Sequence, residues 1–364
     1  MKRRKFLAGA ATGAAVVAAS TFPKPALSQG MMELKMVTTW PKNFPGLGTT
    51  AERLAKRIGE ASEGQITIKV FAAGEIVPAF EAFDAVSQGT ADMYHGAEYY
   101  WVGKSKAFAF FAAVPFGLTA TEMNAWVYWN GGQELWDELA GEFNLKCLLA
   151  GNTGVQMGGW FNKEINSIED YKGLKFRMPG FGGEVLRRLG AAVVNLPGGE
   201  IFPALQSGAI DGSEWVGPWN DLAFGFYKVV KNYHYPGFHE PGTAEGLGIN
   251  RKVWDGFTKN QQQLIATACQ AENSVTLAEF NAKNGAALKV LVEEHGVKLH
   301  RFPNEVLQQI GKISGEVMAE AGATDAITRK VYESFLKSRT ASISWSKLSD
   351  QAYWNARLLP FKYN

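Results

Sequence analysis

The stretch that decides the fold class is Glu-Leu-Lys-Met-Val-Thr-Thr at residues 33–39, read together with the two segments that follow it. Apolar and polar side chains alternate along residues 33–39, which is the pattern of a half-buried strand. Residues 49–60 instead place Leu54 and Ile58 on one helical face, and residues 65–71 (Gln-Ile-Thr-Ile-Lys-Val-Phe) alternate again. A strand, a helix and a second strand in this order predict a parallel sheet with helices packed on it.

The same succession of short apolar runs and amphipathic stretches continues along the chain. The sequence predicts further strands at residues 146–150, 174–178 and 192–195, and helices near residues 184–189, 203–206 and 261–283. A chain of 364 residues is also longer than one soluble domain usually is. We therefore expect two domains or two lobes.

Two short motifs occur twice, in the same order. Residues 74–79 (Gly-Glu-Ile-Val-Pro-Ala) return as 199–204 (Gly-Glu-Ile-Phe-Pro-Ala), and residues 85–92 return as 204–211. Both copies of the second motif predict a short helix that ends at a glycine, followed by a strand that begins near an aspartate. The spacing differs between the copies, so they are not tandem repeats of an array. They indicate two lobes that use the same local arrangement.

The first 28 residues have the layout of an export signal. Arg3 and Arg4 precede an apolar run that extends to Ala19, and Ala26-Leu27-Ser28 forms a small-x-small cleavage site. The paired arginines resemble a twin-arginine signal, whose cargo crosses the membrane already folded. The apolar run is shorter than the roughly 20 residues of a membrane span, so cleavage is expected rather than anchoring. The mature protein is then expected in the periplasm.

Composition and charge exclude several classes of protein. The chain is 46% apolar and 20% charged, which is close to a globular average and unlike a disordered or collagen-like chain. Five basic residues and no acid lie in the first 28 positions, so 32 basic residues face 35 acidic ones in the remainder. Because no polybasic stripe is left, nucleic acid is not an expected partner.

The residue types of common enzyme sites lack their usual spacing. The five histidines form no zinc-binding motif, and no Gly-x-Ser-x-Gly run is present. His239 and Glu240 are adjacent, and on an extended chain adjacent side chains point to opposite sides. Cys147 and Cys269 lie among apolar residues, and we expect them to be unpaired, although the sequence leaves a disulfide open.

One motif leaves an oxidoreductase open as an alternative. Residues 46–51 (Gly-Leu-Gly-Thr-Thr-Ala) fit a dinucleotide-binding pattern, and export of a preloaded nicotinamide enzyme would agree with the twin-arginine signal. However, residues 40–45 separate these glycines from the preceding strand, whereas the motif needs them directly after it. The pattern is therefore a weak indication.

Polar residues gather in three segments that are rich in glycine or aromatic residues. These are residues 151–160 (Gly-Asn-Thr-Gly-Val-Gln-Met-Gly-Gly-Trp), 173–178 (Gly-Leu-Lys-Phe-Arg-Met) and 211–218 (Asp-Gly-Ser-Glu-Trp-Val-Gly-Pro). Taken singly, Arg177 would more often be a surface residue of a strand, and Glu214 a solvated acid. Taken together, the segments form a recognisable set.

The segments 151–161, 173–180 and 209–218 resemble the solute-binding proteins of tripartite ATP-independent periplasmic (TRAP) transporters. The Leu-Lys-Phe-Arg run is typical of the wider family. The Asn-Thr-Gly-Val-Gln-Met and Glu-Trp-Val-Gly-Pro runs resemble the branch that binds 2-oxo or 2-hydroxy acids, such as pyruvate and lactate, with a metal ion. The resemblance spans the expected mature chain, from Trp40-Pro41-Lys42 through Tyr99-Tyr100 to the aromatic C-terminus.

The resemblance implies an α/β protein with a two-lobed, periplasmic-binding-protein-like fold. Each lobe would be a mixed, mostly parallel sheet flanked by helices, with the ligand cleft between the lobes. Lobe I would comprise residues 33–155 and about 244–285, and lobe II residues 156–243 and about 286–341. Such a protein is not an enzyme: it captures a small monocarboxylate and delivers it to the membrane permease of the transporter.

The resemblance also implies the site. The ligand-binding residues would be Tyr99, Tyr100, Asn152, Gln156, Arg177, Glu214 and Trp215. The metal ligands would be Gln156, Glu214, Trp215 and Glu240. Arg177 would hold the ligand carboxylate, since a guanidinium matches a carboxylate bidentately, and Trp215 would offer its backbone carbonyl. Oxygen ligands suit Na⁺, Ca²⁺ or Mg²⁺ rather than zinc, with Na⁺ or Ca²⁺ favoured, and no organic cofactor is implied.

The C-terminal segment, residues 342–364, is expected to contain an amphipathic helix. Residues 342–359 place apolar side chains along one side, and Pro360 would end the helix. The residues on this side are Trp345, Leu348, Ala352, Asn355 and Leu359. Such a face covers either its own lobe or a second subunit. The resemblance implies the second choice, because relatives form dimers that exchange a C-terminal helix.

Overall fold

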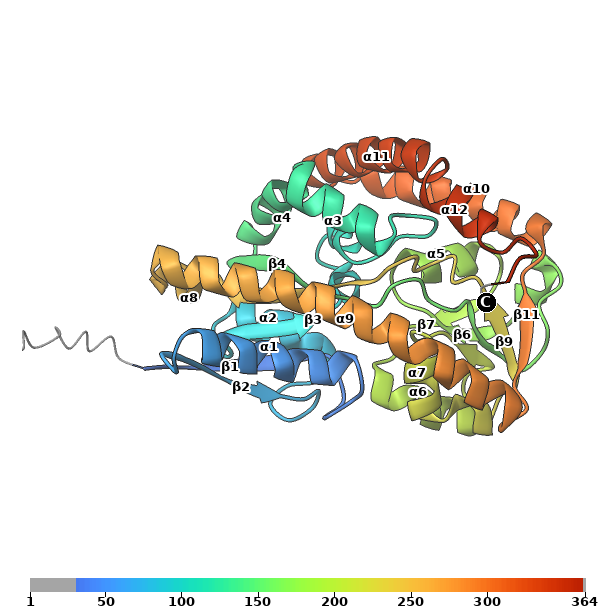
Figure 1. Cartoon of the computed structure of the whole chain (residues 1–364), viewed down its shortest axis with the longest axis horizontal. Coiled ribbons are helices and arrows are strands. Elements are labelled where there is room, and N and C mark those ends of the chain that lie inside the picture. Colours follow the sequence, from blue (N-terminus) through green and yellow to red (C-terminus); the bar gives the residue numbers. More distant parts are fainter. Residues whose placement is uncertain (1–30, 363–364) are drawn as a thin grey trace, which may run out of the picture. The chain divides into compact units, whose positions relative to one another are not determined.

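Two β-sheets organise residues 31–362, the part of the chain that the computed structural model describes (Figure 1). The first sheet consists, in spatial order, of β2 (Ile66–Phe71), β1 (Met32–Thr38), β3 (Met93–Gly96), β10 (Ala244–Asn250) and β4 (Leu145–Asn152). The second sheet consists of β11 (Lys298–Arg301), β9 (Asn232–Tyr235), β5 (Gly159–Phe161), β8 (Gly212–Ser213), β6 (Lys175–Arg177) and β7 (Ala192–Val194). The expected export signal, residues 1–28, lies outside the described residues.

Both sheets are mixed, as expected. In the first, β2, β1 and β3 are parallel, and β10 lies antiparallel between β3 and β4. In the second, β7, β6 and β8 are parallel, and β5 lies antiparallel between β8 and β9. The predicted strands at 146–150, 174–178 and 192–195 correspond to β4, β6 and β7. The two sheets therefore share one core order: three parallel strands followed by an antiparallel one.

The repeated sequence motif corresponds to a repeated structure. In each copy a helix ends at a glycine with positive φ, which is 81° at Gly89 and 71° at Gly208. The aspartate that follows accepts a hydrogen bond from the backbone of the neighbouring parallel strand: Asp92 from Lys35 at 2.7 Å, and Asp211 from Lys175 at 2.9 Å. Each aspartate thus fixes the register of the strand that begins beside it, β3 in one sheet and β8 in the other.

Helices surround both sheets. The α-helices of the N-terminal half are α1 (Leu47–Ala61), α2 (Ala82–Ser87), α3 (Ala120–Trp129), α4 (Gly132–Gly141) and α5 (Gly180–Arg188). Those that follow are α6 (Gly198–Gln206), α7 (Pro218–Phe224), α8 (Arg251–Gly256), α9 (Lys259–Glu293), α10 (Asn304–Gly322), α11 (Ala326–Ser346) and α12 (Asp350–Ala356). Short 3₁₀ turns are η1 (Ala79–Glu81), η2 (Glu98–Trp101), η3 (Lys106–Phe111), η4 (Ile168–Tyr171) and η5 (Phe226–Lys228). The helices predicted at 184–189, 203–206 and 261–283 lie within α5, α6 and α9.

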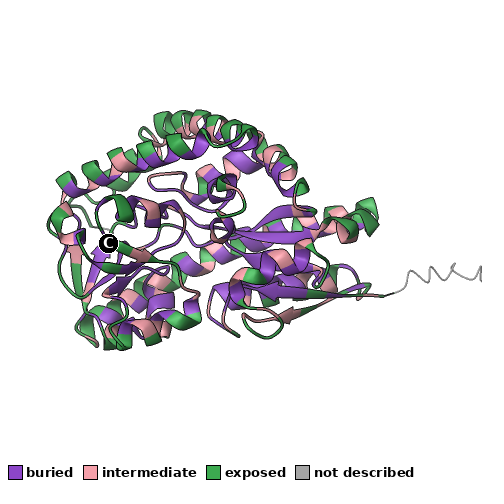
Figure 2. Ribbon diagram, turned by 180° about the vertical axis from the view of Figure 1, so that it is seen from behind, coloured by how far each residue is buried: buried purple, intermediate pink, exposed green. Residues whose placement is uncertain are grey.

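The predicted apolar face of α1 packs against the first sheet. Leu54 and Ile58 are fully buried in a cluster with Met36 of β1 and Ile265 of α9. Figure 2 shows the same pattern across the molecule: the strands are largely buried, and exposed residues lie on the outer faces of the helices. Cys147 and Cys269 are both buried and unpaired, as expected.

Helix α9 packs on elements of both sheets. It contacts β4 of the first sheet and α1, which packs on that sheet. It also contacts α7, which lies beside the second sheet (Figure 1). The chain also passes between the sheets after β4 and again before β10. Of the helices that the structure describes, none is long and apolar enough to cross a membrane.

The prediction of one continuous C-terminal helix over residues 342–359 is wrong, because two helices cover this segment. Helix α11 runs on to Ser346, a turn follows, and α12 covers only Asp350–Ala356. Ser349 has φ −98° and ψ −96°, which interrupts the helical path between them. The expected face is therefore divided between two helices.

Candidate functional site

The predicted site residues come together where strands of both sheets end. Tyr99 and Tyr100 follow β3, and Asn152 ends β4 in the first sheet. Arg177 ends β6 and Glu214 directly follows β8 in the second sheet. Because β6 and β8 are parallel neighbours, Arg177 and Glu214 emerge side by side, as expected for ligand sites at the carboxyl ends of strands in α/β proteins.

Arg177 is buried, with 1% of its surface exposed, and its donors point in different directions. Nε donates to the backbone carbonyl of Leu196 at 2.9 Å, and Nη1 donates to Oε1 of Glu214. Nη2 has no hydrogen-bond partner among the described residues. A buried guanidinium with one unused donor is suited to an additional anion. The expectation that Arg177, taken alone, is a surface residue is wrong. The alternation of apolar and polar residues along β6 does not predict its burial, because the strand ends at Arg177 inside the protein.

Two further titratable side chains, His239 and Glu240, lie close to the carboxylate of Glu214. His239 Nε2 lies 3.3 Å from Glu214 Oε2 and 3.9 Å from Glu240 Oε1. Ligand atoms of Glu214, His239 and Glu240 all lie within 4.8 Å of one another. Burial, followed by the charge of Glu214, raises the pKa of Glu240 to about 7. Two acids so close together repel each other, and a cation between them removes the repulsion.

His239 shows where reasoning from the sequence was wrong. Its side chain and that of Glu240 were expected to point to opposite sides of an extended chain. The backbone instead turns here: Phe238 N donates to Pro236 O at 3.0 Å, and Glu240 N donates to Gly237 O at 3.3 Å. Both side chains therefore reach the same cluster. Their adjacency in sequence was the signal that could have identified His239.

Gln156 is oriented by two threonines that the sequence analysis did not single out. Its Nε2 donates to Thr153 Oγ1 at 3.1 Å and to Thr243 Oγ1 at 2.9 Å. The Thr243 hydroxyl in turn donates to Oε2 of Glu240. With the amide nitrogen held in this way, Oε1 of Gln156 is left without a partner in the described part of the chain. An unused, buried amide oxygen is a suitable ligand for a hard cation.

The first sheet contributes donors. The side-chain oxygen of Asn152 accepts from Gly154 N at 2.9 Å, so its Nδ2 remains as a buried donor without a described partner. The Tyr99 hydroxyl donates to Glu240 Oε2 at 3.4 Å, which links the two sheets across the site. Tyr100 lies near Arg177, and burial raises the pKa of its hydroxyl to about 12, so that it stays protonated at neutral pH.

Trp215 is held by aromatic contacts and by the loop that follows it. Its ring lies 6.3 Å from that of Trp40 and 5.3 Å from the guanidinium carbon of Arg177. The next residue, Val216, donates its N–H to Asp221 Oδ1 at 3.2 Å. Asp221 is itself fixed by Trp160 and Tyr233, at 2.9 and 2.6 Å. Asp221 therefore positions the segment that carries Glu214 and Trp215.

The cavity beside this cluster is small, and Arg177, Asn152, Glu214 and Glu240 are not among the residues that line it. It measures about 10 Å³ and is lined by Trp40, Leu47, Tyr99, Tyr100, Thr153, Gln156, Trp215, Val216, Thr243 and Glu245. This is close to the least volume that one water molecule needs. Admission of an organic acid therefore requires the two walls to separate.

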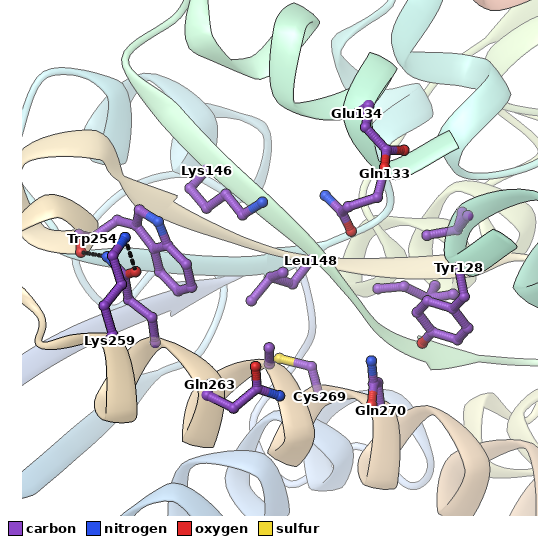
Figure 3. Close-up of a pocket in the computed structure, with 14 residues that line it drawn as sticks. Tyr128, Gln133, Glu134, Lys146, Leu148, Trp254, Lys259, Gln263, Cys269 and Gln270 are labelled. Carbon is purple, nitrogen blue, oxygen red and sulfur yellow. Dashed lines mark hydrogen bonds between the residues drawn. The ribbon is translucent and has the colours of Figure 1, made fainter. Parts of the chain in front are cut away.

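A larger cavity lies elsewhere on the first sheet, between β4, α4, α8 and α9 (Figure 3). Its volume is about 530 Å³, and Figure 3 shows Lys146, Trp254 and Cys269 on its walls. Lys146 is held by Asp137 Oδ2 at 2.6 Å. Within residues 31–362, none of the lining side chains has a buried polar atom without a partner. The larger cavity thus lacks the unused donors and acceptors that distinguish the smaller one.

The glycines at residues 46–51 do not form a dinucleotide site. Gly46 begins α1, and a Cβ there would lie 2.6 Å from Phe280 Cζ and 3.0 Å from Trp219 Cζ3. Aromatic side chains therefore occupy the space beside Gly46 into which a pyrophosphate would have to fit. The oxidoreductase alternative is not supported.

Comparisons with known proteins agree with this arrangement. The model of the family "DctP: Bacterial extracellular solute-binding protein, family 7" matches residues 36–325. A monocarboxylate 2-oxoacid-binding periplasmic protein from Nostoc sp. is 41% identical over 360 residues, which cover 98% of each chain.

Two solved structures are similar over nearly the whole described chain. A TRAP transporter solute-binding protein from Bordetella bronchiseptica RB50, a mixed-occupancy dimer with calcium and picolinate in one site, has a TM-score of 0.88 and 34% identity, covering 90% of this chain and 97% of that one. A TRAP periplasmic solute-binding protein from Pseudoalteromonas atlantica T6c, with sodium and pyruvate, has a TM-score of 0.87 and 39% identity, covering 92% and 100%. The chain belongs to the DctP family of bacterial extracellular solute-binding proteins.

Proposed function

We propose that this protein is the solute receptor of a TRAP transporter, and that it binds a small 2-oxo or 2-hydroxy monocarboxylate, such as pyruvate or lactate, together with Na⁺ or Ca²⁺. One observation carries the proposal: unused donors of Arg177 and Asn152 and an unused oxygen of Gln156 converge on a buried pair of acids. This set matches an anion and a cation bound side by side. The ligands named for the similar proteins from Nostoc sp. and Pseudoalteromonas atlantica support the same class.

In this proposal Arg177 binds the ligand carboxylate through Nη2. Asn152 donates to the same carboxylate or to the 2-oxygen, and the hydroxyls of Tyr99 and Tyr100 complete the ring of donors. In the structure Nη1 of Arg177 is paired directly with Glu214, so Nη2 is the donor that remains for the ligand carboxylate.

The cation would be held by Gln156 Oε1, the carboxylates of Glu214 and Glu240, and the backbone carbonyl of Trp215. The fit rests on the chemistry of the donors: two acids and an amide oxygen favour a hard cation. A bound cation supplies positive charge that offsets the mutual repulsion of the acids. His239 would position the carboxylate of Glu214, since its Nε2 lies 3.3 Å from Glu214 Oε2.

Ligand capture would close two lobes around the site. We assign residues 33–155 and about 244–285 to lobe I, and residues 156–243 and about 286–341 to lobe II. The two separate sheets and the strand ends that meet between them support this division. The protein itself would carry out no chemical reaction, and its second partner would be the membrane permease of the transporter.

Export to the periplasm would use the twin-arginine signal, with cleavage after Ser28. The periplasmic relative from Nostoc sp., which aligns over 98% of this chain, supports the location.

The direct test is mass spectrometry of the protein purified without refolding, first under native conditions and then after denaturation. We expect a released monocarboxylate of three to five carbons, and Na⁺ or Ca²⁺ in equal amount. Release of a sugar acid, an amino acid or a nucleotide instead would contradict the proposed ligand class.

The protein is further proposed to form a homodimer through its C-terminal helices. Large apolar side chains near the C-terminus are exposed: Trp345 (69%) of α11, Leu348 (74%) of the turn that follows, and Trp354 (49%) of α12. The dimer of the similar protein from Bordetella bronchiseptica supports this reading. Light scattering should give a dimer for the mature chain and a monomer for a Trp345→Glu, Leu348→Glu double variant. A monomeric mature chain at micromolar concentration would contradict it.

A further inference from the structure

Glu245 is a buried acid that the proposed binding set does not use. It lies near the start of β10, has 0% of its surface exposed, and lines the small cavity together with Trp40 and Gln156. Neither of its carboxyl oxygens has a hydrogen-bond partner among residues 31–362. A buried carboxyl left in this way costs free energy, so its presence on the wall of a ligand cavity calls for a function.

The nearest polar group to Glu245 is His95, whose orientation is fixed. Trp40 Nε1 donates to His95 Nδ1 at 2.9 Å, so the neutral imidazole carries its proton on Nε2. Burial lowers the pKa of His95 to about 3, which keeps the ring neutral. Nε2 lies 3.6 Å from Oε2 of Glu245, which is beyond a normal hydrogen bond. One donor and one acceptor therefore lie close together without being paired to each other.

The nearby guanidinium groups do not satisfy Glu245. Arg53 donates to Glu272 at 2.6 Å and to Glu279 at 2.8 Å, and Arg57 reaches Glu272 at 3.4 Å. Burial, together with the charge of Glu272, raises the pKa of Glu245 well above its usual range. The carboxyl can then donate as well as accept a hydrogen bond.

A comparison with Glu98, in the turn η2 that follows β3, shows that a buried acid need not be left unsatisfied. Glu98 is also 0% exposed, and its two oxygens accept from the Tyr94 hydroxyl at 2.9 and 3.1 Å. Glu98 is not among the residues that line the cavity. The difference between the two acids lies in what each faces: a fixed tyrosine in one case, and the cavity in the other.

We infer that Glu245, oriented beside His95, is a specificity-determining residue that hydrogen-bonds a hydroxyl group on the ligand carbon chain beyond the 2-oxygen. This inference rests on the proposed function, in which the carboxylate end is held at Arg177 by the second sheet. The far end of the ligand would then point to the cavity wall formed by Trp40 after β1, Leu47 of α1 and Glu245 of β10.

The chemistry of this wall selects a hydroxyl over other polar ends. A hydroxyl can accept from His95 Nε2–H and also exchange a hydrogen bond with the Glu245 carboxyl. A second carboxylate would be desolvated at a wall that offers it no cationic side chain, which is costly. An ammonium group offers no acceptor to His95. The expected ligands are therefore short hydroxylated 2-oxo acids.

The test compares plain and hydroxylated acids of the same length by calorimetry: pyruvate with hydroxypyruvate, and 2-oxobutyrate with 4-hydroxy-2-oxobutyrate. The wild-type protein should bind the hydroxylated member about tenfold more tightly at one of these lengths, the value of one good buried hydrogen bond. Glu245→Leu should lose this preference while binding the plain acid within about threefold of wild type. Glu245→Gln, which keeps an acceptor, should retain part of the preference.

Glu98→Gln is the matched control, because it replaces a buried acid beside the first sheet that does not line the cavity, and it should retain the wild-type preference. Equal binding of plain and hydroxylated acids by the wild-type protein at both lengths overturns this inference and leaves the proposed function standing. Binding of none of the four acids overturns the proposed function, and this inference with it.

Discussion

Calorimetric titration of an Arg177→Lys variant with pyruvate is expected to show a severe loss of affinity. The guanidinium donates to Leu196 O through Nε and to Glu214 through Nη1, and its unpaired Nη2 is proposed to donate to the ligand carboxylate. A lysine ammonium is a single point donor and cannot serve all three. Truncation of a desolvated, charged partner costs about 2–5 kcal/mol, so the Kd should rise roughly 30-fold to 4,000-fold.

Lys175→Met provides the control for the Arg177 prediction. Lys175 lies two residues earlier on β6, with 48% of its side chain exposed. This variant removes a positive charge outside the site, which is a larger change of charge than Arg177→Lys makes. Its affinity for pyruvate should equal that of wild type. Circular dichroism has to confirm that the Arg177→Lys variant is folded, since Glu214 loses an ion-pair partner in it. A folded Arg177→Lys variant within about threefold of wild type would refute the assignment of Arg177.

Removal of the cation is expected to weaken acid binding almost as strongly. The buried carboxylates of Glu214 and Glu240 lie together, and ligand and cation would each reduce the cost of binding the other. Couplings of this kind are typically about 5-fold to 150-fold in affinity. Thermal-shift titrations with pyruvate in chelated, desalted buffer should therefore show smaller shifts than titrations with Na⁺, Ca²⁺ or Mg²⁺ restored.

Glu214→Gln tests whether the coupling passes through this acid. The variant should lose most of the metal dependence and much of the affinity for pyruvate while remaining folded. Glu200→Gln, an exposed acid of α6, should behave as wild type. Identical shifts for the wild-type protein in metal-free and metal-replete buffer would exclude the cation from the site and leave Glu214 as a partner of Arg177 alone.

Local patterns in the sequence predicted the elements of the fold well. Alternation identified β1, β2 and β6, and helical periodicity placed Leu54 and Ile58 in the core. The repeated motif predicted that both halves use the same helix and strand, which the equivalent contacts of Asp92 and Asp211 confirm. These features succeed because each depends on neighbours close in the chain.

Features that depend on distant parts of the chain were not predicted from local patterns. The burial of Arg177 results from the meeting of two sheets, which alternation along one strand does not encode. The inward turn of His239 depends on backbone contacts around Pro236, and the importance of Glu245 depends on His95, far away in sequence. The family resemblance supplied Gln156, Glu214 and Glu240, but it carried no information about His239, Thr243 or Glu245.

The long helix α9 has a mechanical consequence for how the protein moves. Its 35 residues make a stiff beam about 50 Å long. Beside the first sheet, α9 is held by ion pairs from Arg53 of α1 to Glu272 at 2.6 Å and to Glu279 at 2.8 Å. Toward its other end the contacts are uncharged: Asn284 accepts a hydrogen bond from Trp219 N at 3.1 Å, and the rings of Phe280 and Trp219 pack with their centroids 5.4 Å apart. We expect the uncharged contacts to break first, so that α9 moves with the first sheet while the second sheet moves relative to both. Trp219 lies four residues after Trp215, so this movement would also displace the segment that is proposed to bind the ligand.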